Sequence, residues 1–172
     1  TEDIIFGPKL SFSVIGKEAL SEGQNINKLT RRIATDVCVF DQYACASPHT
    51  LFVEENNHLK PFDFAKLLAK QIEVISKRIP KERSDPGIVS NIISKRLEYE
   101  FTENMWASND TDWTVLFDNK GSEGLVNPTY SRVITVRSIN DIMNAAKFAN
   151  QNIQTISIAS SLKRKLQFAE IA

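Results

Sequence analysis

The chain has 172 residues, of which 42% are hydrophobic, and its 21 lysines and arginines balance 21 aspartates and glutamates. This length and apolar content are typical of one globular domain with a substantial core. The zero net charge gives no long-range field that would gather nucleic acid or an anionic membrane. No apolar run approaches the roughly 18 residues of a membrane-spanning helix, and no signal-peptide pattern is present. Two cysteines and two histidines make neither a disulfide framework nor a metal-ligand cluster, so we expect a reducing, cytoplasmic location and no metal.

The first predicted elements are a strand and a helix. Alternating apolar and polar residues predict a half-buried strand at residues 10–15, and a polar loop follows at 21–25. Apolar side chains then recur at helical spacing from Ile26 to Phe40, which predicts an amphipathic helix over this stretch. Cys38 lies beside the apolar face of that helix, and we predict that it only packs in the core.

Helices and strands alternate through the rest of the chain. We predict strands at residues 50–54, 113–117, 130–136 and 153–159, and helices at 61–79, 139–149 and 161–169, with a further helix that begins at Asp85-Pro86 and ends before residue 109. Such alternation indicates an α/β fold, an open and mostly parallel sheet with helices on both faces.

Cys45 lies between the predicted helix that ends at Phe40 and the strand that begins at Thr50. Small and polar residues precede Cys45, and Pro48 disfavours helical geometry at Ser47. We therefore predict that Cys45 lies on a loop. Rigid scaffolds present reactive groups on such connections. A thiol is the best side-chain nucleophile near neutral pH. Spacing alone still favours a simpler interpretation, in which Cys45 is a small buried hydrophobe.

Two further features bear on the chemistry. The glycines at positions 7, 16, 23, 87, 121 and 124 form neither a Gly-x-Gly-x-x-Gly nor a P-loop pattern, so a self-contained dinucleotide site is not expected. His49 follows Cys45 by four residues. Its imidazole could deprotonate or orient a group near the thiol, or it could make a structural hydrogen bond only.

Two linked segments resemble a known family. The sequence DQYACASPHTLFVE at residues 41–54 is similar to the active-site cysteine segment of the bacterial fatty-acyl (acyl-CoA) reductases that supply aldehyde to luciferase, a branch of the aldehyde dehydrogenase superfamily. The sequence FGPKLSFSV at 6–14 resembles the strand that precedes the cysteine helix in that family. The resemblance implies that residues 1–172 form the cysteine-bearing catalytic domain, a fragment of a longer chain without the cofactor-binding domain.

The resemblance also implies a mechanism. The Cys45 thiolate attacks a long-chain acyl thioester, either acyl-CoA or acyl-protein, and the acyl-cysteine is reduced to aldehyde by hydride from NADPH. Ordinary aldehyde dehydrogenases carry Gly-Gln-x-Cys where this chain has Gln-Tyr-Ala-Cys. Ile5 stands where the superfamily has the glutamate that activates a deacylating water, and its loss suits a reductase. Glu123 lies one position from the register of the glutamate that contacts the nicotinamide ribose.

The resemblance also implies partners, and other functions stay open beside it. It implies acyl-transferase and acyl-protein synthetase subunits as partners, and a homo-oligomer for the full-length enzyme. Other interpretations stay open: another CoA-acylating aldehyde dehydrogenase, a non-catalytic α/β interaction module, or a cysteine hydrolase that uses Cys45 and His49 with a third, orienting group. The residues do not decide between NADPH and NADH or fix the acyl chain length.

Overall fold

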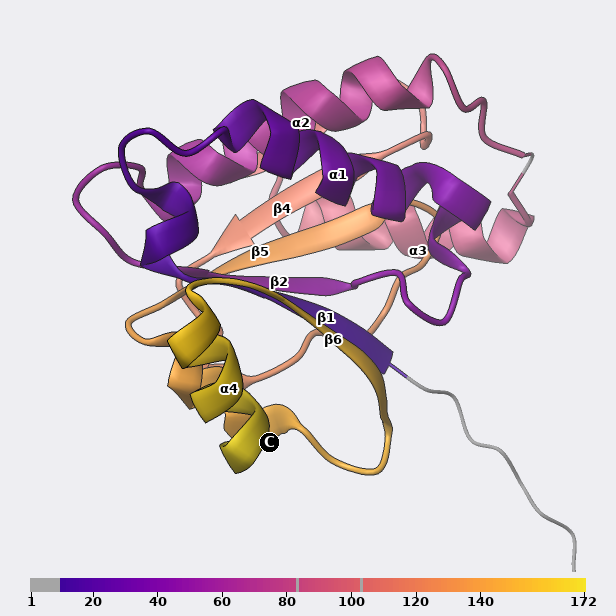
Figure 1. The fold of residues 1–172 in the computed structure, drawn as a ribbon. Helices are drawn as coiled ribbons and strands as arrows, with labels where there is room; N and C mark the ends of the chain where they lie inside the picture. The colour runs from indigo at the N-terminus through magenta and orange to yellow at the C-terminus, as the bar shows by residue number, and fades with distance from the viewer. Residues whose placement is uncertain (1–9, 83, 103) are drawn as a thin grey trace, which may run out of the picture.

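The computed structural model describes residues 10–172 except residues 83 and 103, so Ile5 lies outside the described part of the chain. Its centre is a six-stranded sheet with the order β3-β4-β5-β2-β1-β6 (Figure 1). The strands are β1 (Leu10–Ile15), β2 (Thr50–Glu54), β3 (Met105–Ala107), β4 (Thr114–Asp118), β5 (Val133–Ile139) and β6 (Ile153–Ala159). All neighbours are parallel except β3 and β4. The predicted mostly parallel α/β fold is confirmed.

Helices cover both faces of the sheet (Figure 1). They are α1 (Ile26–Cys38), α2 (Pro61–Ser76), α3 (Pro86–Leu97) and α4 (Leu162–Ile171), with shorter 3₁₀ segments η1 (Lys17–Leu20), η2 (Val39–Gln42), η3 (Gly121–Glu123) and η4 (Ile142–Phe148). Successive residues of a strand point to opposite faces. Leu51 and Val53 of β2 therefore join the core beneath α1 and α2, while Phe52 joins Phe168 of α4 on the other face. α3 adds a small third cluster through Ile92.

The predicted starts of α1, α2 and α3 are confirmed, and each has a local cause. The Asn25 side chain accepts a hydrogen bond from the Lys28 N–H and so caps α1. Pro61 occupies the first turn of α2, where its missing N–H costs nothing. Asp85 caps α3 ahead of Pro86.

The first two helices end earlier than predicted, and α2 stops at Ser76 and not at residue 79. The first helix ends at Cys38, and Phe40, predicted on its buried face, is 75% exposed because the backbone turns left-handed there. The third helix ends at Leu97, before residue 109 as predicted, but the short edge strand β3 that follows at residues 105–107 was not predicted. The spacing of Ile88, Ile92, Ile93 and Leu97 predicts a buried stripe on α3, but only Ile92 is buried, where it packs against Leu116 and Val133.

The fifth strand is also shifted. It was predicted at residues 130–136, but β5 is Val133–Ile139, because Tyr130, Ser131 and Arg132 have φ values of 59°, 58° and 66°. Ile139 therefore ends a strand and does not begin a helix. The helical segment that follows, η4, is a 3₁₀ helix whose start is capped by the Asp141 carboxylate, which accepts from the Met143 N–H at 2.9 Å.

Arg164 fastens α4 to the edge of the sheet where the parallel strands end, which we call the carboxyl edge. Its guanidinium donates to both carboxylate oxygens of Glu54, at 2.6 and 2.8 Å. It also donates to Glu18 at 3.2 Å and to Asp141 at 2.7 Å. The bonds to Glu54 raise the pKa of Arg164 above its ordinary value. One side chain thus joins α4 to η1, β2 and the start of η4.

Candidate functional site

Cys45 lies where the sequence placed it, on the connection between α1 and β2. This is the amino edge of the sheet, where the parallel strands begin. The thiol is exposed, whereas the other cysteine, Cys38, is fully buried in the core. The Cys45 carbonyl accepts a hydrogen bond from Ser11 Oγ on β1 at 2.5 Å. Its N–H donates to no backbone carbonyl in the described part of the chain, which leaves it free to bind an oxygen of a ligand.

Side chains brace the loop on both sides of Cys45. Gln42, which is buried, donates from Nε2 to the Pro48 carbonyl at 2.7 Å and to the Val133 carbonyl at 3.0 Å. Ser47 Oγ donates to the Asp36 carbonyl of α1 at 2.9 Å. The loop therefore cannot shift without breaking bonds to α1 and β5. An exposed thiol on a braced loop is what an acyl-transfer nucleophile requires.

His49 is buried, with 5% of its surface exposed, and lies where the same loop ends, directly before β2. Its ring packs edge-on against Tyr130, with centroids 4.8 Å apart, and Tyr130 stacks on Tyr43 at 5.4 Å. Burial lowers the pKa of His49 to about 4, so the ring is neutral at pH 7. Its Nδ1 is buried without a hydrogen-bond partner among the described residues. No hydrogen bond joins it to the Cys45 thiol within this part of the chain, so the structure brings the two residues to one edge without forming a dyad.

The protein is expected to lose stability in acid because of His49. Its folded pKa of about 4 lies below the ordinary 6.5. Between these two pH values the imidazole is protonated in the unfolded state and neutral in the folded state. The contribution of neutral His49 to the free energy of unfolding is therefore complete above pH 6.5 and declines as pH falls toward 4. The difference is on the order of 3 kcal/mol. In urea unfolding between pH 6.5 and pH 4, the free energy of unfolding should depend less steeply on pH in His49→Gln than in the unmodified protein.

His58 provides the matched control, since it is exposed on the turn before α2. The variant His58→Gln should keep the pH dependence of the unmodified protein. If His49→Gln and the unmodified protein lose stability in parallel from neutral pH to pH 4, His49 is not held neutral by burial.

The two cysteines should differ sharply in reactivity. Burial raises the pKa of Cys38 to about 11 from 9.0, which lowers its thiolate fraction roughly 100-fold relative to an ordinary thiol, and its side chain is inaccessible. Iodoacetamide should therefore modify Cys45 at least about 100-fold faster than Cys38 in the folded protein. Peptide mapping after brief labelling measures this ratio. Modification of Cys38 first, or of Cys45 only after unfolding, would remove the physical basis of the site.

Glu123 pairs with Lys120 and makes no hydrogen bond to Cys45 in the described part of the chain. It is exposed at the end of η3, on the carboxyl edge, where a Cβ added to Gly121 would lie 2.1 Å from the Ser138 carbonyl oxygen of β5. Val126 follows Glu123 by three residues, a span of at most about 11 Å, and Val126 lies at the start of β2. Glu123 therefore lies within about 11 Å of the amino edge, without a hydrogen bond to the thiol among the described residues. The chain after it returns toward the amino edge, where Val126 N–H donates to Thr50 Oγ1 at 3.0 Å.

Several residues that shape the site were not predicted from the sequence. Ser11, Gln42, Tyr130 and Arg132 come from three separate parts of the chain and meet only in the fold. Gln42 and Arg132 did carry a signal, because each is a long polar side chain next to an apolar run. A long polar side chain beside an apolar run indicates a buried polar network, but it does not identify the residues to which that side chain bonds.

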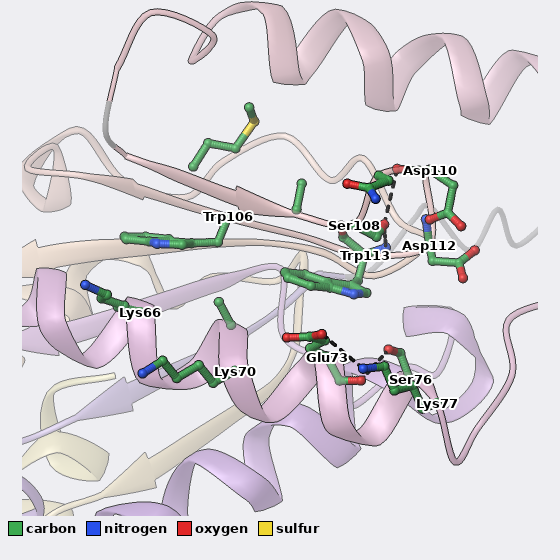
Figure 2. A pocket seen from close by; sticks show the side chains of 14 residues that line it. Lys66, Lys70, Glu73, Ser76, Lys77, Trp106, Ser108, Asp110, Asp112 and Trp113 are labelled. Atoms are coloured by element: carbon green, nitrogen blue, oxygen red, sulfur yellow. Dashed lines mark hydrogen bonds and ion pairs between the residues drawn. The ribbon is translucent and has the colours of Figure 1, made fainter.

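A cavity of about 670 Å³ opens between α2 and the β3–β4 connection (Figure 2). The indole rings of Trp106 and Trp113 form its apolar wall, and Lys66 and Lys70 of α2 lie opposite (Figure 2). Its charged residues balance, with three lysines against Glu73, Asp110 and Asp112. Cys45 and His49 do not line it. In the described part of the chain no group of three histidine, cysteine or acidic residues could hold a metal ion, and no helix is long and apolar enough to cross a membrane.

The fold is that of the aldehyde dehydrogenases. An NAD-dependent aldehyde dehydrogenase from Burkholderia multivorans superposes with a TM-score of 0.73 at 12% identity, over 95% of this chain and 33% of the other. The aldehyde dehydrogenase KauB from Pseudomonas aeruginosa gives a TM-score of 0.65 at 12% identity, over 96% of this chain and 36% of the other. Within that fold class the chain belongs to the acyl-CoA reductase (LuxC) family, whose model matches residues 1–172.

Two curated relatives carry the same name. The long-chain acyl-protein thioester reductase of Vibrio harveyi is 25% identical over 169 residues, which are 95% of this chain and 33% of the relative. That of Aliivibrio fischeri is 28% identical over 162 residues, or 89% of this chain and 30% of the relative. The chain thus spans about a third of the length of these relatives.

Proposed function

We propose that the protein reduces long-chain acyl thioesters to aldehydes through an acyl-cysteine on Cys45, with NADPH as the hydride donor. The observation that carries this proposal is the exposed Cys45 thiol on a braced loop, in a chain of the acyl-CoA reductase family. The names of the two curated relatives support an acyl-protein as one substrate. Long-chain acyl-CoA is the other.

The protein's own residues account for the acyl-transfer step. The Cys45 sulfur attacks the thioester carbonyl carbon, the new carbon–sulfur bond forms as the bond to the donor sulfur breaks, and the donor thiol leaves with the proton. We assign the N–H of Cys45, which donates to no backbone carbonyl in the described part of the chain, to stabilise the negative charge that develops on the carbonyl oxygen. Neutral His49 could accept a proton at Nδ1, but the absence of a hydrogen bond to the thiol leaves its catalytic role a prediction.

We propose that residues 1–172 do not make a nicotinamide site by themselves. Their sequence contains no glycine-rich phosphate turn, and Glu123 pairs with Lys120 and not with a residue of the Cys45 loop. We therefore propose that NADPH is held mainly by chain outside residues 1–172, which act as the cysteine-bearing catalytic domain. When bound, it supplies the hydride that reduces the acyl-cysteine. We further propose a cytoplasmic homo-oligomer that works with acyl-transferase and acyl-protein synthetase subunits.

Product analysis of the full-length protein tests this function. Palmitoyl-CoA with NADPH should yield palmitaldehyde and free CoA in equal amounts, with NADH compared in parallel. Free palmitic acid as the main product, independent of NADPH, would indicate a thioester hydrolase. Binding of acyl-protein without any product would indicate an interaction module. Either result would overturn the proposal.

A further inference from the structure

We infer that Asp41 and Arg132 form a latch that positions Cys45 for acyl transfer, an inference that rests on the proposed function. Arg132 precedes β5 and is 1% exposed. Its Nε donates to Asp41 Oδ1 at 2.6 Å, and its Nη2 contacts the same carboxylate oxygen. Its Nη1 donates to the Ile79 carbonyl after α2 at 2.9 Å. The other oxygen of Asp41 accepts from the Glu82 N–H at 3.1 Å.

The latch joins two segments with an unusual backbone. Phe40, Asp41 and Gln42 have φ values of 52°, 50° and 68°. The three residues before β5, which end at Arg132, are left-handed as well. This region is disfavoured for every residue with a Cβ, and three such residues in succession are not stable on their own. Each segment therefore depends on bonds from outside itself, and the Asp41–Arg132 pair links one directly to the other.

The position of Cys45 depends on both segments. Cys45 follows Gln42 by three residues, and Gln42 bonds across to the Pro48 and Val133 carbonyls. The rings of Tyr43 and Tyr130 stack with an interplanar angle of 3°, so a second contact joins the same two segments beside the thiol loop. If the ion pair opens, residues 40–42 can return to right-handed geometry. The loop and its thiol would then move.

A stabilising role alone does not explain why the pair is ionic. The cost of removing two charges from water offsets much of the energy gained from their attraction. Apolar residues of similar size therefore often stabilise a fold as much as a buried ion pair does. The Arg132 guanidinium does fix geometry, because Nε and Nη2 both hold one oxygen of Asp41 while Nη1 holds the Ile79 carbonyl, and its hydrogen bonds are directional. We therefore assign Asp41 and Arg132 as positioning residues, while Cys45 alone reacts.

Single-turnover acylation of the full-length protein by palmitoyl-CoA, without NADPH, separates positioning from stability. The amplitude reports the folded fraction, and the rate constant reports how well the thiol is placed. In Asp41→Asn, which keeps the shape of the side chain, the rate constant at saturating palmitoyl-CoA should fall about 10- to 100-fold. The concentration for half-maximal rate should change by less than about threefold, because the substrate-binding surface is intact. Arg132→Met should behave in the same way, and Arg132→Lys should recover part of the rate.

Arg137→Met is the matched control. Arg137 is another buried arginine of the same strand region, and its Nε and Nη2 pair with Asp118 at 3.2 and 3.1 Å on the carboxyl edge. Its loss should lower the amplitude and leave the rate constant unchanged. Equal rate constants for Asp41→Asn and the unmodified protein would overturn the latch while the proposed function stands. Acylation that persists in Cys45→Ser would instead overturn the proposed function, and the latch with it.

Discussion

Cys45→Ser is expected to lower the rate of acyl transfer from a long-chain acyl thioester by on the order of 10³-fold or more. A serine hydroxyl is a much weaker nucleophile than a thiol at neutral pH, and no described side chain hydrogen-bonds to residue 45 as a base that could activate it. Stopped-flow or quenched single-turnover acylation measures the loss.

Cys38→Ala is the control for this variant. Cys38 is fully buried beneath α1 and α2, so its removal should affect stability modestly and the acylation rate constant hardly at all. The assignment would be contradicted if Cys38→Ala were acylated slowly and Cys45→Ser at the normal rate.

Arg164→Met is expected to destabilise the protein by about 3–5 kcal/mol, because it leaves a buried carboxylate without its partner. Glu54 is 2% exposed and receives two hydrogen bonds from Arg164. The Lys17 N–H, at 2.7 Å from Glu54, would be its remaining donor. Glu18 and Asp141 lose the same guanidinium, so three negative charges would face one another across the carboxyl edge.

Urea unfolding measures this loss, and Lys163→Met is the matched control. Lys163 is the neighbouring residue of α4 and is exposed, so its replacement should change the free energy of unfolding by less than about 0.5 kcal/mol. A loss below about 1 kcal/mol for Arg164→Met would show that the Arg164 cluster is solvated and contributes little.

The parts of the fold that repeat a short-range pattern could be predicted from the sequence. Strand β1 alternates, α1 and α2 have helical spacing, and Asn25, Pro61 and Asp85 mark helix starts, so these elements appear where expected. The half-buried character predicted for β1 is wrong, because helices cover both faces of the sheet and its serines are buried as well. Strand β3 was missed because three residues are too short to show a period. The start of β5 was misplaced because an apolar run does not reveal a left-handed turn before it.

The candidate site could be predicted only where one segment carried the information. Pro48 and its small neighbours place Cys45 on a loop, and the structure has it there. The Asp41–Arg132 pair could not be predicted, because it joins residues 91 positions apart. Left-handed backbone is usually signalled by glycine, and neither segment contains one. The position of Glu123 depends on the path of the segment between β4 and β5, which no local pattern describes.

The most direct test of the account is to trap the acyl group and find the residue that carries it. The full-length protein would be incubated with palmitoyl-CoA in the absence of NADPH, digested at acidic pH to preserve thioesters, and examined by peptide mass spectrometry. We expect a palmitoyl group on the peptide that contains Cys45. When NADPH is added before digestion, this group should be lost from the peptide and palmitaldehyde should form. A palmitoyl group on Cys38 or on a non-cysteine residue, or aldehyde formation with no acylated Cys45 peptide at any time, would contradict the account.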